Sequence, residues 1–340
     1  MNYCINHFKD IELRGIIFSN ALIKECDLCH KTDGLTIDTK SLYELFEPLF
    51  RLYLPDDKSK DSIFSIIEED WSIFDNKDSC ELIINEILRD TELAYLLSKK
   101  VKRINVDSTS KQIEIWKDFV SEIKSKNRFF IDNDIIGEET LKDILSFYNN
   151  KIKAGQIFYR SRVCDTYKGY RKAMMGAPPN YLASAGRANP QGISYFYLSK
   201  EEDTTLYETR STYLDYVCVA EFKLKEDINI INLHNISVVS PFSDGLDLSA
   251  YLANKDLVIE FEKALSTPLR RFDSELDYLP TQYLCEYIKS IGFDGIEYSS
   301  AMKSGGTNYA IFYQDKFQFE SKKVIEVKSV KIGSVEIDSL

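Results

Sequence analysis

Two short pairs of cysteine and histidine near the N-terminus have the residue types and the spacing of a metal site. They read C-x-x-H and C-x-x-C, and their members are Cys4, His7, Cys26 and Cys29. Two intervening residues let both members of a pair reach one ion from a single turn, and thiolate and imidazole suit tetrahedral zinc. Because protein would fill all four positions, we expect a structural zinc, with His30 as a spare ligand. Incidental cysteines are the alternative.

A second group of candidate residues lies in four segments of the C-terminal half. The segments are YR at the end of an expected strand, GAPPNYLASAGRANPQG, YFYLSKEEDTTLYETR and GFDGIEYSSAMKSGGTNYAIFY. The polar side chains of interest in them are Arg160, Arg187, Tyr197, Glu208, Ser300 and Asn308. Taken one at a time, such residues are usually surface charges, caps or packing side chains, so only their combination points to a site.

The elements that must position these residues fall into three regions of different composition. Residues 1–35 hold the clustered Cys and His, residues 36–153 read almost entirely as helix, and residues 154–340 mix strands with helices. Ser41 to Glu44 has capping-box spacing. Apolar stripes at helical intervals begin at Leu42, Ile83, Ile115 and Leu141. We expect a small helical bundle with a regulatory or interaction role.

Ribonuclease chemistry of the kind that pairs an Arg with a His a few residues later is excluded from this bundle. The three histidines of the chain are His7, His30 and His234, and all of them lie outside it.

The C-terminal half is expected to be α+β. Apolar alternation predicts strands at Ile157–Arg160, Ile193–Ser199, Tyr216–Lys225, Ile228–Leu233, Asp294–Ser299, Asn308–Tyr313 and Val324–Ile337. Helices are predicted at Thr204–Thr212, Leu246–Leu265 and Pro280–Ile291.

Composition restricts the partners and the compartment. The formal net charge is -11, and an acidic chain is a poor general nucleic-acid binder, so no nucleic acid is expected. The start of the chain has no secretory pattern and no apolar run reaches the length of a membrane span, which predicts a cytoplasmic protein without a membrane partner. The remaining cysteines, Cys80, Cys164, Cys218 and Cys285, read as reduced thiols.

Six motifs of the C-terminal half occur in the order of the RES family, which is named for its characteristic Arg, Glu and Ser. They are YR at 159–160, GRANPQG at 186–192, YFYLS at 195–199, Glu208, DGIEYSS at 294–300 and NYAIF at 308–312. Over residues 155–315 the chain therefore resembles this family. The N-terminal half is similar to the zinc-knuckle and helical extension, called HEPN/RES N-terminal, of some members. Ala188 departs from the family pattern, which usually has an aromatic residue there, and this leaves ligand packing near Arg187 open.

The resemblance implies a multidomain enzyme: a zinc knuckle (1–35), an α-helical bundle (36–153) and an α+β RES domain (154–340) with a fold similar to ADP-ribosyltransferases. Its implied activity is cleavage of NAD between nicotinamide and ribose, as an NAD glycohydrolase or NAD phosphorylase. A bacterial toxin or anti-phage defence effector that depletes NAD is the implied role. Besides NAD, the implied partner is a protein antitoxin or trigger, which the N-terminal module would dock; a homo-oligomer stays open.

Carried over by motif, the catalytic residues are Glu208, Arg160 and Ser300, and the NAD-binding residues are Arg160, Arg187, Tyr197 and Asn308. The Y-x-S spacing favours Ser300 over Ser299 as the family serine. Arginine binds phosphate bidentately, an aromatic ring attracts the cationic nicotinamide, and a carboxylate stabilises an oxocarbenium-like transition state. Because nicotinamide leaves as a neutral molecule, one carboxylate can suffice where most glycosidases use two.

Two other functions fit the same residues. An ADP-ribosyltransferase would use the same NAD site with a macromolecular acceptor. A catalytically inactive regulator would bind NAD without turnover, and the intact Arg, Glu and Ser positions argue against it.

Overall fold

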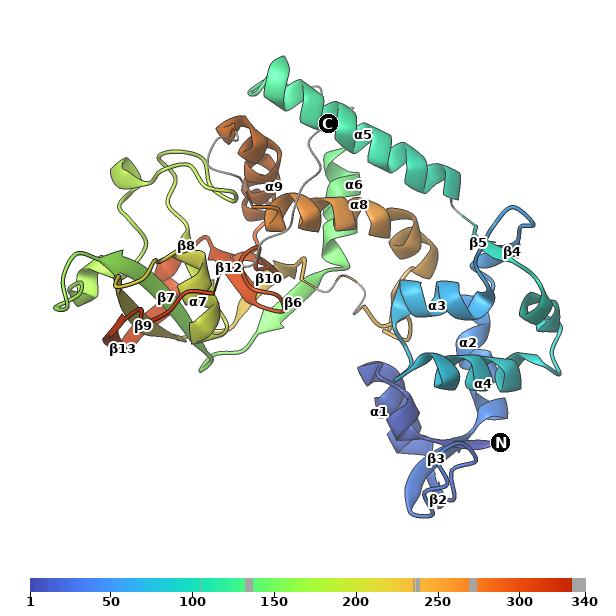
Figure 1. Cartoon of the computed structure of the whole chain (residues 1–340). Helices are drawn as coiled ribbons and strands as arrows, with labels where there is room; N and C mark the ends of the chain where they lie inside the picture. Colours follow the sequence, from blue (N-terminus) through green and yellow to red (C-terminus); the bar gives the residue numbers. More distant parts are fainter. Residues whose placement is uncertain (105, 132–136, 235, 237–238, 269–273, 332–340) are drawn as a thin grey trace. The chain divides into compact units, whose positions relative to one another are not determined.

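The computed structural model describes residues 1–104, 106–131, 137–234, 236, 239–268 and 274–331. The chain divides into two compact units (Figure 1). Unit 1 comprises Met1–Trp116 and Asn235–Val258, and unit 2 comprises Lys117–His234 and Ile259–Leu340. Unit 1 is thus built from two separate stretches of chain. The division into a knuckle, a bundle and a RES domain stays a prediction.

Unit 1 begins with a small antiparallel sheet followed by helices. The sheet has the order β1-β3-β2, and its strands are β1 (Asn2–Cys4), β2 (Leu22–Lys24) and β3 (Gly34–Asp38). The helices are α1 (Ile11–Asn20), α2 (Tyr43–Phe50), α3 (Ile63–Trp71), α4 (Lys77–Leu88) and the first part of α5 (Val106–Ser125) and of α8 (Leu248–Ser266). A two-stranded ribbon joins β4 (Tyr53–Pro55) to β5 (Val101–Arg103).

The second stretch of unit 1 packs into the core made by the first. The rings of Trp71 and Tyr251 stack with centroids 5.0 Å apart, and those of Phe46 and Phe242 lie 4.9 Å apart. Tyr251 is fully buried, and its hydroxyl donates to the Ile236 carbonyl at 2.8 Å. Ile236 and residues 239–258 therefore belong to this unit, although they are distant in sequence from its first stretch.

A group of buried charges, here called the Asp70 network, also joins the two stretches. Its members are Tyr53, Asp70, Trp71, Arg103, Lys255 and Asp256. Asp70 is 0% exposed and accepts from Arg103 Nε at 3.0 Å and from the Tyr53 hydroxyl at 2.9 Å. Lys255 donates to the Glu69 and Asp70 carbonyls at 3.0 and 2.5 Å. Each buried charge thus has an opposite charge and several hydrogen bonds, as burial requires.

The capping box predicted at Ser41 is wrong. Residues Thr39–Leu42 form a 3-10 turn, Leu42 precedes α2, and the Ser41 hydroxyl donates instead to the Asp38 carbonyl at 2.6 Å. Asp38 takes over the capping role, because its side chain accepts from the Lys40 N–H at 3.2 Å.

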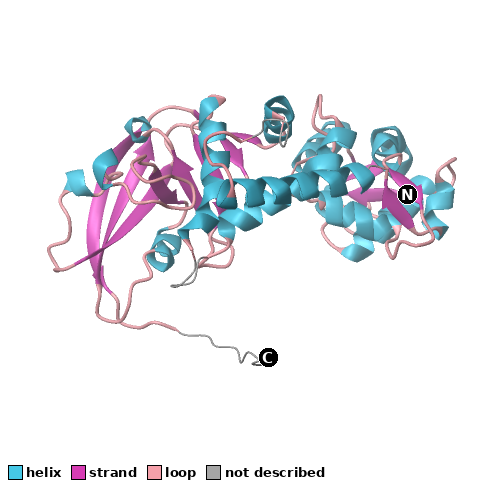
Figure 2. Ribbon diagram, turned by 90° about the horizontal axis from the view of Figure 1, so that it is seen from above, coloured by secondary structure: helices cyan, strands magenta, loops and turns pink. Residues whose placement is uncertain are grey.

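Unit 2 is built on an eight-stranded mixed sheet with the order β13-β9-β7-β8-β12-β11-β10-β6 (Figure 2). The strands are β6 (Asn149–Ile152), β7 (Ile157–Cys164), β8 (Phe196–Ser199), β9 (Tyr216–Leu224), β10 (Ile228–Asn232), β11 (Gly295–Ser299), β12 (Thr307–Ile311) and β13 (Phe317–Glu326). Only the β10–β11 pair among them is parallel. The helices are α6 (Glu138–Ser146), α7 (Glu202–Glu208), α9 (Leu279–Ser290) and the remaining parts of α5 and α8. The α+β expectation for this half is confirmed.

Two details of the sheet differ from the sequence expectation. Asn149–Ile152, placed in the helical region, forms strand β6 and pairs antiparallel with β10. The last strand begins at Phe317 and ends at Glu326, while part of the predicted Val324–Ile337 segment lies outside the described residues.

Strands β7 and β8 share one residue pair and then part. Tyr159 pairs with Ser199, whereas Arg160 and the residues after it pair with β9 alone. Strand β8 in turn pairs with β12. Helix α7 packs on both β7 and β8. The sheet therefore opens between its two central strands, and this opening is the place where side chains of both strands are free to face a ligand.

Candidate active site

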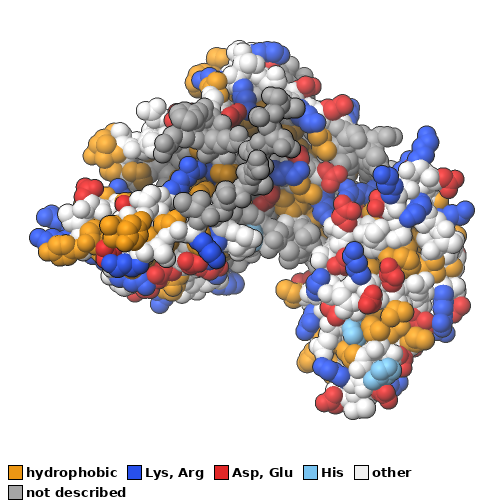
Figure 3. Space-filling view, in the orientation of Figure 1, with side chains coloured by type: hydrophobic (Ala, Val, Ile, Leu, Met, Phe, Trp, Pro, Cys, Tyr) orange, Lys and Arg blue, Asp and Glu red, His pale blue; other side chains and the backbone are white. Residues whose placement is uncertain are grey.

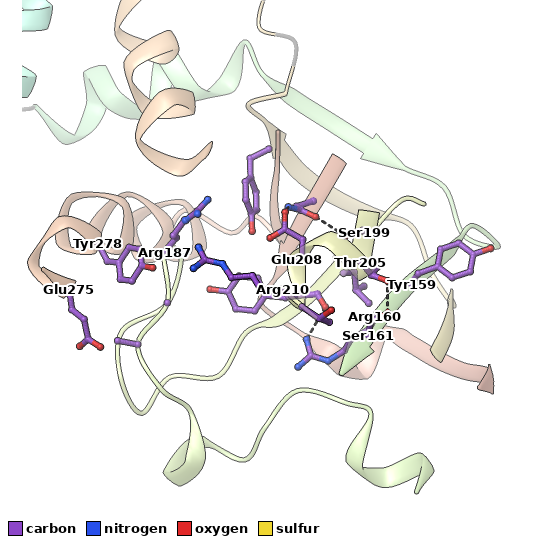
Figure 4. A pocket seen from close by; sticks show the side chains of 17 residues that line it. Tyr159, Arg160, Ser161, Arg187, Ser199, Thr205, Glu208, Arg210, Glu275 and Tyr278 are labelled. Atoms are coloured by element: carbon purple, nitrogen blue, oxygen red, sulfur yellow. Dashed lines mark hydrogen bonds between the residues drawn. The ribbon is translucent and has the colours of Figure 1, made fainter. Parts of the chain in front are cut away.

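A pocket of about 650 Å³ lies where β7 and β8 part (Figure 4). Its lining includes Tyr159, Arg160 and Ser161 from β7, Tyr197, Leu198 and Ser199 from β8, and Gly186, Arg187, Thr205, Glu208, Arg210, Glu275, Tyr278, Tyr298 and Asn308 from elsewhere in unit 2. This volume is in the range of small-molecule and cofactor sites. Five of the six sequence-predicted residues line it, and Ser300 reaches it through Glu208.

The carboxylate of Glu208 is held by two side chains, one from β12 and one that directly follows β11. Glu208 is the last residue of α7 and is exposed at the pocket. Its Oε1 accepts from the Ser300 hydroxyl at 2.5 Å and from Asn308 Nδ2 at 2.7 Å. Asn308 Oδ1 accepts in turn from the Ser199 hydroxyl at 2.6 Å. Both fixed donors share one oxygen, so the other carboxylate oxygen is available to a ligand.

The two adjacent serines have different partners. Ser300 bonds Glu208 and also accepts from the backbone N–H groups of Met302 and Lys303, which fixes its hydroxyl. Ser299 Oγ lies 3.0 Å from His234 Nδ1. The geometry therefore gives Ser300, not Ser299, the contact with Glu208.

Arg160 bridges the two strands at the point where they part. Its Nη1 donates to the Tyr197 carbonyl at 2.9 Å, and its guanidinium carbon lies 5.7 Å from the centre of the Phe196 ring. Burial, followed by the nearby Arg162, lowers the pKa of Arg160 to about 10. Its Nε is buried without a hydrogen-bond partner in the described part of the chain. The folded protein thus holds a cation at neutral pH with one donor unused.

Tyr197 holds the loop that carries Arg187. Its hydroxyl donates to Asn189 Oδ1 at 2.6 Å and accepts from the Ala188 N–H at 3.3 Å. Burial raises the pKa of this phenol, so the hydroxyl keeps its proton. The loop passes close by, because a Cβ on Gly186 would lie 2.9 Å from the Tyr197 hydroxyl. Ala188 is buried and is not part of the pocket lining. Its departure from the family pattern therefore does not change which side chains line the pocket.

Arg187 is oriented from two sides. Its Nη1 donates to the carbonyl of Leu265 near the end of α8 at 2.9 Å, and its own carbonyl accepts from the Thr281 hydroxyl at 2.6 Å. The neighbouring Gln282 donates to the Gly186 carbonyl at 2.8 Å. The first turns of α9 thereby fix the backbone around Arg187, and Arg187 is part of the pocket lining.

Several lining residues were not foreseen in the sequence. Ser161 and Thr205 lie with hydroxyl oxygens 2.5 Å apart. Arg210 follows Glu208 by two residues and has a left-handed backbone with φ of 49°. Glu275 and Tyr278 come from a 3-10 turn (Glu275–Tyr278) before α9. Asn189, inside the GRANPQG motif, is not part of the lining but supports it, because its amide donates to the carbonyls of Ser184 and Ile193. That motif was the available signal for Asn189.

The N-terminal cysteines and histidine converge as the spacing predicts. The ligand atoms of Cys4, His7, Cys26 and Cys29 all lie within 4.8 Å of one another. The Cys4 and Cys29 sulfurs are 3.6 Å apart, and Cys26 Sγ is 3.5 Å from His7 Nε2. Tetrahedral zinc with Zn–S bonds of about 2.3 Å places its sulfurs about 3.8 Å apart, so the donor set fits. His30 lies beside Glu25 instead, with a left-handed backbone.

The far ring nitrogen of His7 is also engaged. Its Nδ1 lies 3.3 Å from the Ser79 hydroxyl and 3.6 Å from an Asp75 oxygen. Outer partners of this kind set the tautomer and the ring orientation of metal-binding histidines. The four residues could therefore hold a metal ion in unit 1.

Charged side chains of both signs are intermixed on the face shown in Figure 3. In the described part of the chain, no helix has the length and apolar character to cross a membrane.

Comparison with known proteins gives one family and one structural likeness of interest. The family model described as RES domain matches residues 157–333, which is just over half of the chain. Among solved structures, the chain is similar to the crystal structure of the M. tuberculosis MbcT-MbcA toxin-antitoxin complex, with 12% identity and a TM-score of 0.34, covering 56% of this chain and 93% of the other. No curated protein matches the sequence significantly.

Proposed function

The chain belongs to the RES domain family, and we propose that it cleaves NAD at the bond between nicotinamide and ribose. The observation that carries the proposal is the Glu208 carboxylate, held by Ser300 and Asn308 at a pocket that also contains Arg160, Arg187 and Tyr197. The acceptor for the ribose is water, as in an NAD glycohydrolase, or phosphate, as in an NAD phosphorylase.

Glu208, Ser300 and Asn308 have distinct roles in this reaction. Glu208 uses its available oxygen to bind a ribose hydroxyl and stabilises the positive charge that develops on the ribose ring. Ser300 and Asn308 are positioning residues, because they act on the substrate through Glu208. As the bond to nicotinamide breaks, its electron pair leaves with the neutral ring, and the water or phosphate oxygen bonds to the ribose carbon. An attacking water releases one proton to solvent.

The arginines suit a ligand with two phosphates. Arg160 is a half-buried cation with an unused Nε–H, and a buried donor without a partner is costly until a ligand supplies an acceptor. Arg187 has one N–H group fixed by Leu265, which aims the remaining fork into the pocket. The ring of Tyr197 lines the pocket and gives the cationic nicotinamide an electron-rich neighbour.

The test is nicotinamide release from NAD by the purified chain, with and without phosphate. Replacing Glu208 by Gln keeps the shape and removes the charge, and we expect release to fall at least about a hundredfold. Asp203→Asn is the matched control, because Asp203 lies on the same helix and pairs with Lys303 at 2.9 Å outside the pocket lining. ADP-ribose as second product indicates water as acceptor, and its phosphorylated form indicates phosphate. Release that survives in Glu208→Gln contradicts the proposal.

An ADP-ribosyltransferase is the second candidate, favoured by apolar side chains beside Glu208. Tyr207, Tyr213 and Leu214 are 51, 63 and 52% exposed and flank the segment that contains Glu208 and Arg210. Such a rim suits a macromolecular acceptor. A mass increase on a cellular protein or nucleic acid after incubation with NAD would support transfer, and NAD binding without turnover would indicate the inactive regulator.

For the N-terminal cluster, we propose a structural zinc bound by Cys4, His7, Cys26 and Cys29. Zinc would close a module whose own core is small and whose sheet strands are three to five residues long. We expect one zinc per chain by elemental analysis and a fall in the thermal midpoint of unit 1 on chelation. Cys26→Ser should lose the metal, whereas Cys80→Ser, at a buried thiol outside the cluster, should retain it. Equal zinc content in both variants contradicts the assignment.

The biological role proposed with this activity is that of a toxin or defence effector that depletes NAD in the cytoplasm. The N-terminal module would then dock a protein antitoxin or trigger. Co-purification of a small protein encoded beside the gene, lost on substitution of exposed side chains of unit 1, tests this role.

A further inference from the structure

The pocket has two ends, and each end contains a carboxylate and an aromatic ring. Figure 4 shows Glu208 and Ser199 on one side of Arg187, and Glu275 and Tyr278 on the other. The first end contains the carboxylate assigned to the ribose that loses nicotinamide. The second end contains another carboxylate and another aromatic ring, both of which line the pocket. Arg187 lies between the two ends, just as the pyrophosphate of a dinucleotide lies between its two nucleosides.

The turn that contains Glu275 is held by hydrogen bonds of its neighbours, none of which uses the Glu275 carboxylate. The Ser274 hydroxyl accepts from the Leu276 N–H at 3.2 Å and caps the turn, and the Tyr278 carbonyl accepts from the Thr281 hydroxyl at 2.9 Å. Among the described residues, the Glu275 side chain has no hydrogen bond or ion pair, and it is exposed. Asp277 of the same turn behaves differently, because it pairs with Lys124 at 2.6 Å and is not part of the lining.

We propose that Glu275 and Tyr278 form the adenosine subsite and that Glu275 makes the enzyme selective for NAD over NADP. The inference rests on the proposed NAD cleavage. A carboxylate accepts hydrogen bonds from two neighbouring ribose hydroxyls, and Tyr278 supplies a ring face for adenine. The 2′-phosphate of NADP replaces one of these hydroxyls by a group with like charge, which the Glu275 carboxylate repels.

The arginine nearby does not cancel this selection. Arg187 could attract a 2′-phosphate, but its Nη1 is held by the Leu265 carbonyl and the residue lies between the two ends of the pocket (Figure 4). They serve the pyrophosphate that both dinucleotides share, so Arg187 contributes equally to NAD and NADP. Glu275 is then the group that distinguishes them, because uniform binding confers no specificity.

The experiment compares nicotinamide release from NAD, NADP and nicotinamide mononucleotide by the full chain, Glu275→Gln and the control Asp277→Asn. We expect the native protein to prefer NAD over NADP by at least about tenfold in kcat/KM, and Glu275→Gln to lose most of that preference. Nicotinamide mononucleotide lacks the adenosine, so its cleavage should be the same in all three proteins. Glu275→Arg should favour NADP further, as an arginine accommodates the 2′-phosphate.

The outcomes separate the two proposals. Cleavage of NAD and NADP at equal rates, or a preference that is unchanged in Glu275→Gln, overturns the subsite while NAD cleavage stands. A change with nicotinamide mononucleotide as large as with NAD also overturns it, because the effect then comes from the reacting end. Absence of release from every substrate by the native chain overturns both proposals.

Discussion

The Asp70 network of unit 1 and the pocket of unit 2 both bring charged side chains together, and they differ in how completely those charges are buried and paired. In the network, Asp70 accepts from Arg103 and Tyr53, and Lys255 donates to two carbonyls. In the pocket, Arg160 keeps a buried Nε–H without a partner, and the Glu208 carboxylate has one oxygen committed.

The difference separates a structural site from a binding site. A saturated network gives its whole interaction energy to the folded state and has nothing left for a ligand. A pocket with unused donors lowers the stability of the free protein and recovers that energy on binding. Substitutions in the two places should therefore affect different measurements.

The largest effect is expected in the network. Asp70→Ala leaves Arg103 and Lys255 without their buried counter-charge, and we expect a loss of about 3–5 kcal/mol in the free energy of unfolding by urea titration. Glu92→Ala is the control, because Glu92 pairs with Arg51 on the surface, where such pairs contribute about 0–1 kcal/mol. Equal losses in the two variants would show that the network is not buried as described.

The next effect concerns Arg160, where we expect a loss of activity without a loss of stability. Arg160→Met should lower kcat/KM for NAD by about a hundredfold, because the ligand loses a charge-assisted contact. The thermal midpoint should stay level or rise, since the variant removes a buried cation that is only partly hydrogen-bonded. Arg162→Met, two residues along the same strand and not in the pocket lining, should keep its activity. A loss of stability in Arg160→Met would indicate that Arg160 has a structural role, like the charges of the Asp70 network.

The smallest effect is expected for the serine that positions Glu208. Ser300→Ala removes one of two donors to the carboxylate, and we expect kcat to fall about tenfold with little change in KM. Ser299→Ala provides the comparison, because Ser299 contacts His234 instead. A larger loss in Ser299→Ala than in Ser300→Ala would reverse the assignment of the two serines.

The end of the pocket that contains Glu208 could be predicted from the sequence. Alternation in YVCVAEFKLK predicts β9, and the ordered motifs bring Glu208, Ser300 and Asn308 into one cluster. Strand β6 escapes prediction because NNKI has no alternation and only one apolar residue, Ile152, and its strand form depends on pairing with β10. Glu275 and Tyr278 escape it because a single turn has no periodicity and its place at the pocket depends on how α9 packs.

The capping prediction shows the limit of local patterns. Ser41 and Glu44 have the spacing of a capping box, yet Asp38 starts a 3-10 turn that shifts the beginning of the helix. The spacing of the cysteines is a stronger pattern, because one ion must be reached by all four side chains. Their convergence within 4.8 Å follows from the sequence alone.

The participation of residues 235–258 in unit 1 has a consequence for exchange of domains between genes. A single breakpoint near residue 116 or 150 removes Asp70 and Trp71 and leaves Lys255 and Tyr251, which are 3% and 0% exposed, without their partners. The orphaned segment would present a buried lysine and an aromatic ring to solvent. Recombination that transfers this unit intact therefore needs two crossovers, and the two stretches are expected to be inherited together.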